Sequence, residues 1–220
     1  MVAGKADIQR RIADDRIVPV VVIHDSADAA GLAAALRGGG LRQVEITYRT
    51  AAASAVIAAL RRMAPELLVL AGTVLEQHQL DAAIAAGAQG IVSPAFNLTI
   101  IDRAREAGLT IVPGIATATE LDRARDIGLE LVKVFPAEQL GGVQFLQALN
   151  SVYPQMRFMP TGGITLEKLS EYAPLGCVAA CGMSSLVPHE LLAAARFDEI
   201  ERRMAEARAA MHPAKMSARK

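Results

Sequence analysis

Tryptophan is absent from this chain of 220 residues, and only three tyrosines and five phenylalanines are present. A core with so few aromatic rings must be filled by aliphatic side chains, which suits alanine-rich helices packed on a buried sheet. Net charge is also absent, because 23 basic and 23 acidic residues balance. The chain therefore carries no broad electrostatic footprint for DNA or RNA. It contains no apolar run of transmembrane length and no secretory signal, so we expect a cytoplasmic protein without a membrane partner.

Cysteine is scarce as well. The two cysteines, Cys177 and Cys181, flank one apolar run. On a strand they would lie roughly 13 Å apart, which is too far for a disulfide. The four histidines are scattered along the chain and form no local metal-binding pattern. We therefore expect reduced thiols, as in the cytoplasm, and neither a metal nor a cofactor.

Short apolar runs alternate with alanine-rich helical patterns along the whole chain, and glycines precede several of the runs. Eight such units of about 20–26 residues predict an α/β fold, a (β/α)₈ TIM barrel. A doubly wound open sheet could host the same alternation, but eight regular units favour closure. The runs are 17–23, 43–47, 67–71, 90–93, 110–113, 131–135, 157–160 and 177–181.

No linker or block of charge divides the chain, so we expect one barrel domain over residues 1–212. Ile8 and Ile12 lie at helical spacing among charged residues, which predicts a short N-terminal helix within residues 5–14. Residues 213–220 are polar and basic, and we expect them to be frayed.

One lysine is embedded among hydrophobic residues. Lys133 is in the middle of the run Leu-Val-Lys-Val-Phe, whereas the other four lysines lie near the chain ends or in a polar helical pattern. Burying an unpaired ammonium is costly, so such a lysine is usually paired or functional. A desolvated lysine can act as a neutral amine that forms Schiff bases with carbonyls. The alternative is a lysine that extends from the strand end into water.

The second run contains an acid, Glu45, between two apolar residues. Gln43, Glu45 and Thr47 alternate with Val44 and Ile46, so the polar residues share one face of the strand. Helices cover the outside of a barrel, so the apolar face should point outward and Glu45 inward. The same alternation points Lys133 inward. The two side chains would lie at the same open end of the barrel, either as a structural ion pair or as part of an active site.

The loops after the strands add polar groups where barrel active sites lie. Arg49 follows the second strand and suits a carboxylate, and Thr73 after the third can add a hydrogen bond. Small residues after the seventh and eighth strands, at 161–163 and 182–184, leave backbone N–H groups free to hold a phosphate. Taken singly, a surface arginine, a helix cap and ordinary tight turns would explain the same residues.

Several motifs together resemble one family. The chain resembles the class I 2-keto-3-deoxy-6-phosphogluconate (KDPG) aldolases, in the wider KDPG/4-hydroxy-2-oxoglutarate aldolase family. The matching segments run in order across nearly the whole chain: V-P-V (18–20), V-E-I-T-Y-R-T (44–50), A-G-T-V-L (71–75), S-P (93–94), V-P-G-I-A-T (112–117), K-V-F-P-A-E (133–138), R-F-M-P-T-G-G-I (157–164) and S-L-V-P (185–188).

The resemblance implies a role for each matching site residue. Lys133 would form a Schiff base with the C2 ketone of the substrate, and Glu45 would move protons through the reaction. The remaining residues would bind substrate: Arg49 and Thr73 the pyruvyl carboxylate, Pro94 and Phe135 the pyruvyl group, Thr161 the cleft, and Gly162, Gly163 and Ser184 the terminal phosphate. The family is typically a homotrimer and needs no metal.

The implied reaction is reversible cleavage of KDPG to pyruvate and glyceraldehyde 3-phosphate, a lyase step of the Entner–Doudoroff pathway. Three alternatives stay open. The same chemistry could act on 2-keto-3-deoxy-6-phosphogalactonate or 4-hydroxy-2-oxoglutarate. A sugar-phosphate isomerase or epimerase could use Glu45 as a base without a covalent adduct. A non-catalytic barrel could only bind sugar phosphates.

The chain departs from the family pattern at two places. Relatives often have Gly-Gly-Ser-Trp where this chain has residues 182–185, Gly-Met-Ser-Ser, and often have glycine in place of Ala95. Met183 resists a positive φ where a glycine would not. We therefore expect a phosphate pocket of different shape, with the Schiff-base chemistry unaffected.

Overall fold

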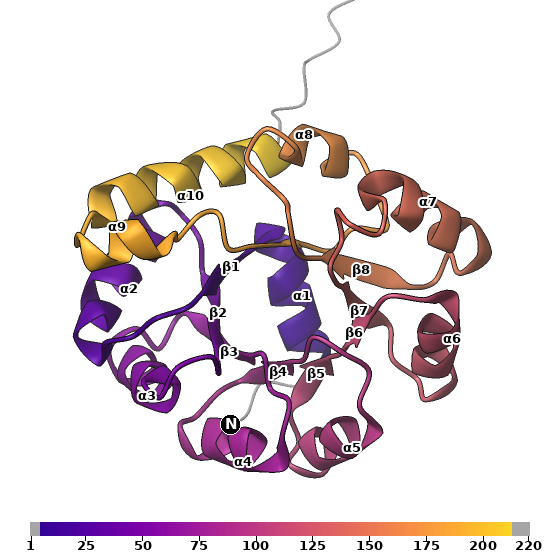
Figure 1. The fold of residues 1–220 in the computed structure, drawn as a ribbon, viewed down its shortest axis with the longest axis horizontal. Helices are drawn as coiled ribbons and strands as arrows, with labels where there is room; N and C mark the ends of the chain where they lie inside the picture. The colour runs from indigo at the N-terminus through magenta and orange to yellow at the C-terminus, as the bar shows by residue number, and fades with distance from the viewer. Residues whose placement is uncertain (1–4, 213–220) are drawn as a thin grey trace, which may run out of the picture.

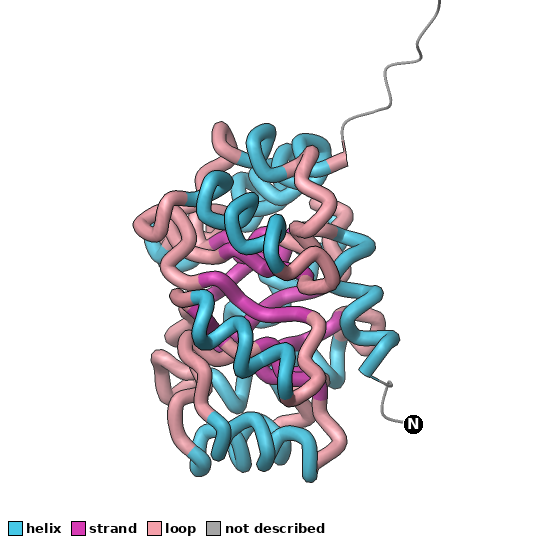
Figure 2. Tube along the Cα trace, turned by 90° about the vertical axis from the view of Figure 1, so that its right-hand side faces the viewer, coloured by secondary structure: helices cyan, strands magenta, loops and turns pink. Residues whose placement is uncertain are grey.

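A computed structural model describes residues 5–212, so the tail predicted at 213–220 lies outside the described residues. Parallel strands occupy the centre and helices surround them (Figures 1 and 2). The strands are β1 (Ile17–Val21), β2 (Gln43–Thr47), β3 (Leu68–Gly72), β4 (Gly90–Val92), β5 (Thr110–Val112), β6 (Gly114–Ile115), β7 (Leu131–Val134), β8 (Arg157–Pro160) and β9 (Cys181–Met183).

Helices follow the strands along the chain, as the alternating pattern predicts. They are α1 (Lys5–Asp15), α2 (Ala29–Gly38), α3 (Ala53–Met63), α4 (Gln77–Ala85), α5 (Leu98–Glu106), α6 (Ala118–Asp126), α7 (Gly142–Val152), α8 (Leu169–Tyr172), α9 (His189–Ala193) and α10 (Phe197–Met211), with a 3-10 turn η1 (Ser26–Asp28). The α/β class with parallel strands is confirmed.

The strand pairing differs from a single sheet of eight strands. One sheet has six strands in the order β5-β4-β3-β2-β1-β9, and a second has three in the order β6-β7-β8. The fifth predicted run, 110–113, forms a strand only to Val112, and a separate short strand, β6, follows Pro113, which has no N–H to donate to a ladder. The eighth run was placed at 177–181, but a strand forms only at Cys181–Met183. Before it, Val178 meets Phe158 in an isolated bridge.

Apolar side chains form two clusters on opposite faces of the strands. Val132 and Val134 of β7 belong to the outer cluster, between strands and helices, whereas Leu131 belongs to the inner one. The predicted alternation of this strand is therefore confirmed, and Lys133 shares the inner face with Leu131.

Helix α1 closes the inner cluster where the strands begin. Its Ile8 and Ile12 are buried in that cluster. The Gln43 amide at the start of β2 donates to the Ile12 carbonyl over 3.2 Å and to the Ile17 carbonyl over 2.8 Å. In Figure 1, α1 lies within the circle of strands. The inner face is thus apolar at one end, which leaves the opposite end for polar groups.

Cys177 and Cys181 are both free and buried. Burial raises the pKa of the Cys181 thiol to about 12. Across residues 5–212, no helix combines the length and the apolar character needed to cross a membrane.

Candidate active site

Lys133 and Glu45 meet on the inner face, although 88 positions separate them in the chain. The Lys133 Nζ lies 3.3 Å from the Glu45 Oε1 atom, and both side chains are almost fully buried, with 5% and 0% exposed. The distance exceeds the 2.7–2.9 Å or so that is usual for a tight charge-assisted hydrogen bond. The two groups are therefore in contact without forming a short, strong hydrogen bond, so a substrate carbonyl could insert beside the amine.

The second carboxylate oxygen of Glu45 has no partner. Glu45 Oε2 is buried and makes no hydrogen bond within the described residues. An unsatisfied buried acceptor is destabilising, and such groups often mark sites that exchange protons with a ligand. This oxygen is therefore a buried acceptor that no described residue occupies.

Gly72 makes room for the Glu45 carboxylate. It pairs with Thr47 at the end of β3, on the strand next to β2. A Cβ added at Gly72 would lie 2.1 Å from Glu45 Oε1, well inside van der Waals contact. Sequence reasoning missed this residue, although a glycine at the end of an otherwise aliphatic strand indicates that another group approaches the backbone closely there.

Thr73 and Arg49 lie on neighbouring loops at the same end of the strands. Thr73 has φ of 55°, a conformation that β-branched residues rarely adopt and that typically costs about 1–3 kcal/mol. Arg49 is exposed and forms no hydrogen bond or ion pair within residues 5–212. It lines a hollow of about 350 Å³ together with Tyr48 and His78. The loops thus present an unpaired cation beside a strained turn.

Phe135 links the lysine to the next loop. Its ring centroid lies 5.6 Å from Lys133 Nζ, within cation–π range. A Cβ at Gly162 would approach the same ring to 3.3 Å, so the glycine packs on it. Pro94 is half-buried on the loop after β4, and no hydrogen bond or ion pair within residues 5–212 joins it to Lys133.

The loop after β8 contains two consecutive glycines with positive φ. Gly162 and Gly163 have φ of 102° and 79°. Their N–H groups make no hydrogen bond with other described residues. Buried Thr161 precedes them and bridges Gly182, and exposed Ser184 follows β9 on the adjacent loop. The structure thus brings together the two loops whose sequences suggested a phosphate site.

A polar cluster that sequence reasoning missed braces this turn. The Glu138 N–H donates to the Gly162 carbonyl over 3.1 Å. Its carboxylate accepts hydrogen bonds from Lys168 and Tyr172. Burial favours the neutral acid, but the two hydrogen bonds outweigh it and lower the pKa of Glu138. Burial and the hydrogen bond to Glu138 raise the pKa of Tyr172. No local signal predicted the cluster, since Glu138 lies 30 and 34 positions from its two partners.

Met183 differs from the expectation of a strained loop position. It is the last residue of β9, pairs with Pro19 and is fully buried in the outer cluster. A strand residue needs no positive φ, so the methionine causes no strain here. Among the described residues, no group of three or more His, Cys, Asp or Glu side chains is arranged to hold a metal ion.

Comparisons with known proteins agree with one another. The family model described as KDPG and KHG aldolase matches residues 8–203. The 2-dehydro-3-deoxy-phosphogluconate aldolase of Treponema pallidum is 46% identical over 185 residues, 84% of this chain and 88% of that protein. The KHG/KDPG aldolase of Escherichia coli K12 is 40% identical over 87% of this chain and 90% of its own length.

A solved structure shows the same fold. The KDPG aldolase of Legionella pneumophila, in which pyruvate was captured at low pH as a covalent carbinolamine intermediate, superposes with a TM-score of 0.87. It is 33% identical, and the match covers 91% of this chain and 97% of that one. From the family model and these identities, the chain belongs to the KDPG and KHG aldolase family.

Proposed function

We propose that this chain is a class I aldolase, a carbon–carbon lyase that reversibly cleaves KDPG to pyruvate and glyceraldehyde 3-phosphate. One observation carries the proposal: buried Lys133 lies 3.3 Å from buried Glu45, whose second oxygen has no hydrogen-bond partner among the described residues. A nucleophilic amine and an acid/base group in contact are what Schiff-base chemistry requires.

The first half of the reaction forms the imine. The Lys133 ammonium first passes a proton to Glu45, and the neutral Nζ then attacks the C2 ketone while Glu45 protonates the ketone oxygen. The nitrogen of the carbinolamine next gives a proton back to Glu45. Glu45 returns a proton to the carbinolamine hydroxyl, which leaves as water. The inner face next to Leu131 excludes bulk water and so protects the protonated imine from early hydrolysis.

The second half of the reaction breaks the C3–C4 bond and then protonates C3. Glu45 takes the C4 hydroxyl proton, the C3–C4 electron pair moves into the protonated imine, and the aldehyde product leaves. Protonation of the enamine at C3 and hydrolysis of the imine release pyruvate and restore Lys133. Glu45 Oε2 is the oxygen available for the proton transfers, because Oε1 contacts the amine.

Substrate binding uses both ends of the site. We assign the pyruvyl carboxylate to Arg49 and Thr73, and the terminal phosphate to Gly162, Gly163 and Ser184. Pro94 and Phe135 border the pyruvyl group, and Thr161 lines the cleft between the two ends. Within residues 5–212 neither the Arg49 guanidinium nor the N–H groups of Gly162 and Gly163 have a hydrogen-bond partner, which supports this orientation.

The two sheets belong, in this proposal, to one closed (β/α)₈ barrel and one domain. The Lys133 N–H donates to the Pro113 carbonyl over 2.8 Å, which joins the sheets on one side. The bridge between Thr161 and Gly182 joins them on the other. A homotrimer and a cytoplasmic location stay predictions, and a native mass of one or two chains would contradict the first.

Borohydride trapping tests the proposed function. The full chain is incubated with pyruvate and sodium borohydride, and the adduct is mapped by mass spectrometry. We expect one reduced pyruvyl adduct, on Lys133. An unmodified Lys133 would contradict the covalent mechanism and favour an isomerase or a binding protein.

A substrate panel then separates the members of the aldolase class. The E. coli relative is named for both KHG and KDPG, so 4-hydroxy-2-oxoglutarate is the second candidate substrate. We expect a higher kcat/KM for KDPG, measured by coupled assay of pyruvate release. A preference for 4-hydroxy-2-oxoglutarate or the galactonate analogue would reassign the substrate while leaving the Schiff base in place.

Gly72→Ala should reduce kcat by about 10²-fold, because the added methyl displaces the Glu45 carboxylate and misplacement of about 1 Å is costly to catalysis. Gly176→Ala is the matched control, since a Cβ there meets no atom within 4 Å. Steady-state assays of both variants check the prediction. Equal kcat for Gly72→Ala and the parent chain would show that Glu45 needs no such room.

A further inference from the structure

The loops after β8 and β9 are joined at two points. Thr161 and Gly182 form an isolated parallel bridge, and the Ser185 hydroxyl donates to the Ile164 carbonyl over 3.0 Å. The stretch of each loop between these points holds the residues proposed to bind phosphate. The hydrogen bond from Ser185 to Ile164 therefore sets the distance between the two loops that form the phosphate site.

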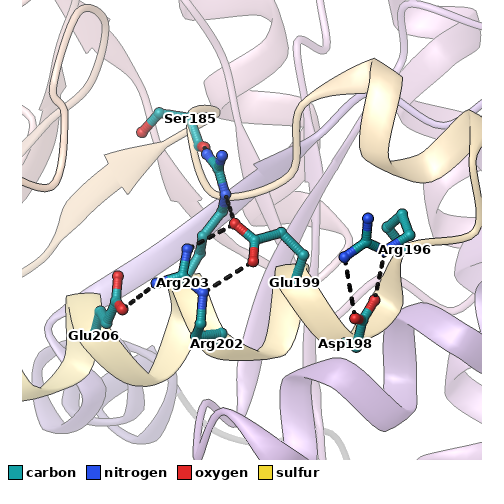
Figure 3. Close-up of polar contacts among 7 residues, drawn as sticks. All are labelled: Ser185, Arg196, Asp198, Glu199, Arg202, Arg203 and Glu206. Atoms are coloured by element: carbon teal, nitrogen blue, oxygen red, sulfur yellow. Dashed lines mark hydrogen bonds and ion pairs between the residues drawn. The ribbon is translucent and has the colours of Figure 1, made fainter.

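Ser185 is itself held from a distant helix. Arg203 of α10 donates through Nη1 to the Ser185 carbonyl over 3.2 Å and through Nε to Glu199 Oε1 over 3.1 Å (Figure 3). The planar guanidinium thus uses two donors in fixed directions, one to the loop and one to its own helix.

Glu199 keeps Arg203 in place. It also accepts two hydrogen bonds from Arg202, over 2.9 and 2.7 Å. The bonds from Arg202 and Arg203 lower the pKa of Glu199 to about 2, so the acid is ionised at any working pH. Arg202 touches Glu199 and Glu206 but makes no contact with the loop in Figure 3.

Helix α10, which carries Arg203 and Glu199, is held in place by its packing on the rest of the protein. Its buried face packs into the outer cluster, and the helix contacts α2 and β1. A helix fixed by its core face is a poor hinge, so Arg203 can hold the loop rather than follow it. The buried residues of that face are Ile200, Met204, Ala207 and Met211.

We propose that Ser185 and Arg203 are positioning residues that hold the β9 loop against the β8 loop and so determine how tightly this chain binds the phosphate end of its substrate. Neither touches the reacting atoms. The inference rests on the proposed function, both for the identity of the substrate and for the placement of its phosphate between these two loops.

The test compares a phosphorylated with an unphosphorylated substrate. Ser185→Ala, Arg203→Met and the double variant are assayed with KDPG and with 2-keto-3-deoxygluconate, and inorganic phosphate binding is measured by calorimetry. Loss of one positioning hydrogen bond should raise the KM for KDPG and the Kd for phosphate about fivefold. We expect kcat and the kcat/KM for 2-keto-3-deoxygluconate to change by less than twofold. The double variant should resemble the worse single variant, because both act on one loop.

Two controls isolate the contact. Arg202→Met removes an arginine that also binds Glu199 on the same helix, and Ser151→Ala removes a hydroxyl that bonds only a carbonyl of α7. Both should keep the phosphate Kd of the parent chain. Ser185→Thr keeps a hydroxyl and should restore binding that Ser185→Ala loses.

The outcomes separate this inference from the proposed function. A parent-like KM and phosphate Kd in both Ser185→Ala and Arg203→Met would overturn it, as would an equal loss with both substrates. Ser185→Ala decides the case if Arg203→Met does not fold, since it deletes a single oxygen. A chain that binds no phosphate also overturns it, whereas a missing pyruvate adduct on Lys133 overturns only the proposed function.

Discussion

Lys133→Met is expected to abolish cleavage of KDPG, with kcat lowered by about 10⁴-fold or more, because the variant lacks the amine that we assign to the covalent intermediate. Methionine approximates the length of lysine and can pack against the Phe135 ring, which lies 5.6 Å from Nζ. Coupled assay of pyruvate release measures the loss. Residual activity within about 100-fold of the parent would mean that the reaction does not run through Lys133.

The same variant should be less stable than the parent chain. Removing the ammonium leaves the fully buried Glu45 without its cation, and breaking a buried ion pair typically costs about 3–5 kcal/mol. Combining Lys133→Met with Glu45→Gln should recover most of that stability but no activity. Urea unfolding of the three chains separates a lost nucleophile from a lost fold. An inactive but stable double variant is the result we expect.

Glu45→Gln should lower kcat by about 10²–10⁴, since it removes the acid/base group while keeping the shape of the side chain. Gln cannot take the C4 hydroxyl proton or the proton of the attacking amine. The KM for KDPG should change little, because Glu45 is not among the residues that we assign to the substrate carboxylate or phosphate. Steady-state kinetics measures both constants.

Exchange of the pyruvate methyl protons into deuterium oxide gives a second readout of Glu45. That exchange reports enamine formation without C–C chemistry, so it should slow in parallel with cleavage when Glu45 becomes Gln. Borohydride trapping should still yield the Lys133 adduct, at a reduced rate. Proton exchange within about fivefold of the parent would assign the base to another group.

Local rules predicted much of this protein because they need only neighbouring residues. Alternation along 43–47 and 131–135 placed Glu45 and Lys133 on the inward face, and the structure brings their side chains into contact. Strand pairing was less predictable, since a separate short strand follows Pro113 and the eighth run, 177–181, forms a strand only from Cys181 onward.

The sequence by itself determined the α/β alternation, the inward direction of the lysine and the acid, and the family. These follow from pleat, helix period and motif order, which are properties of short segments. Only the tertiary structure decided the 3.3 Å separation of Lys133 from Glu45, the space that Gly72 provides and the contact of Arg203 with Ser185. Those contacts join residues far apart in the chain, and their distances depend on how every helix packs on the strands between them.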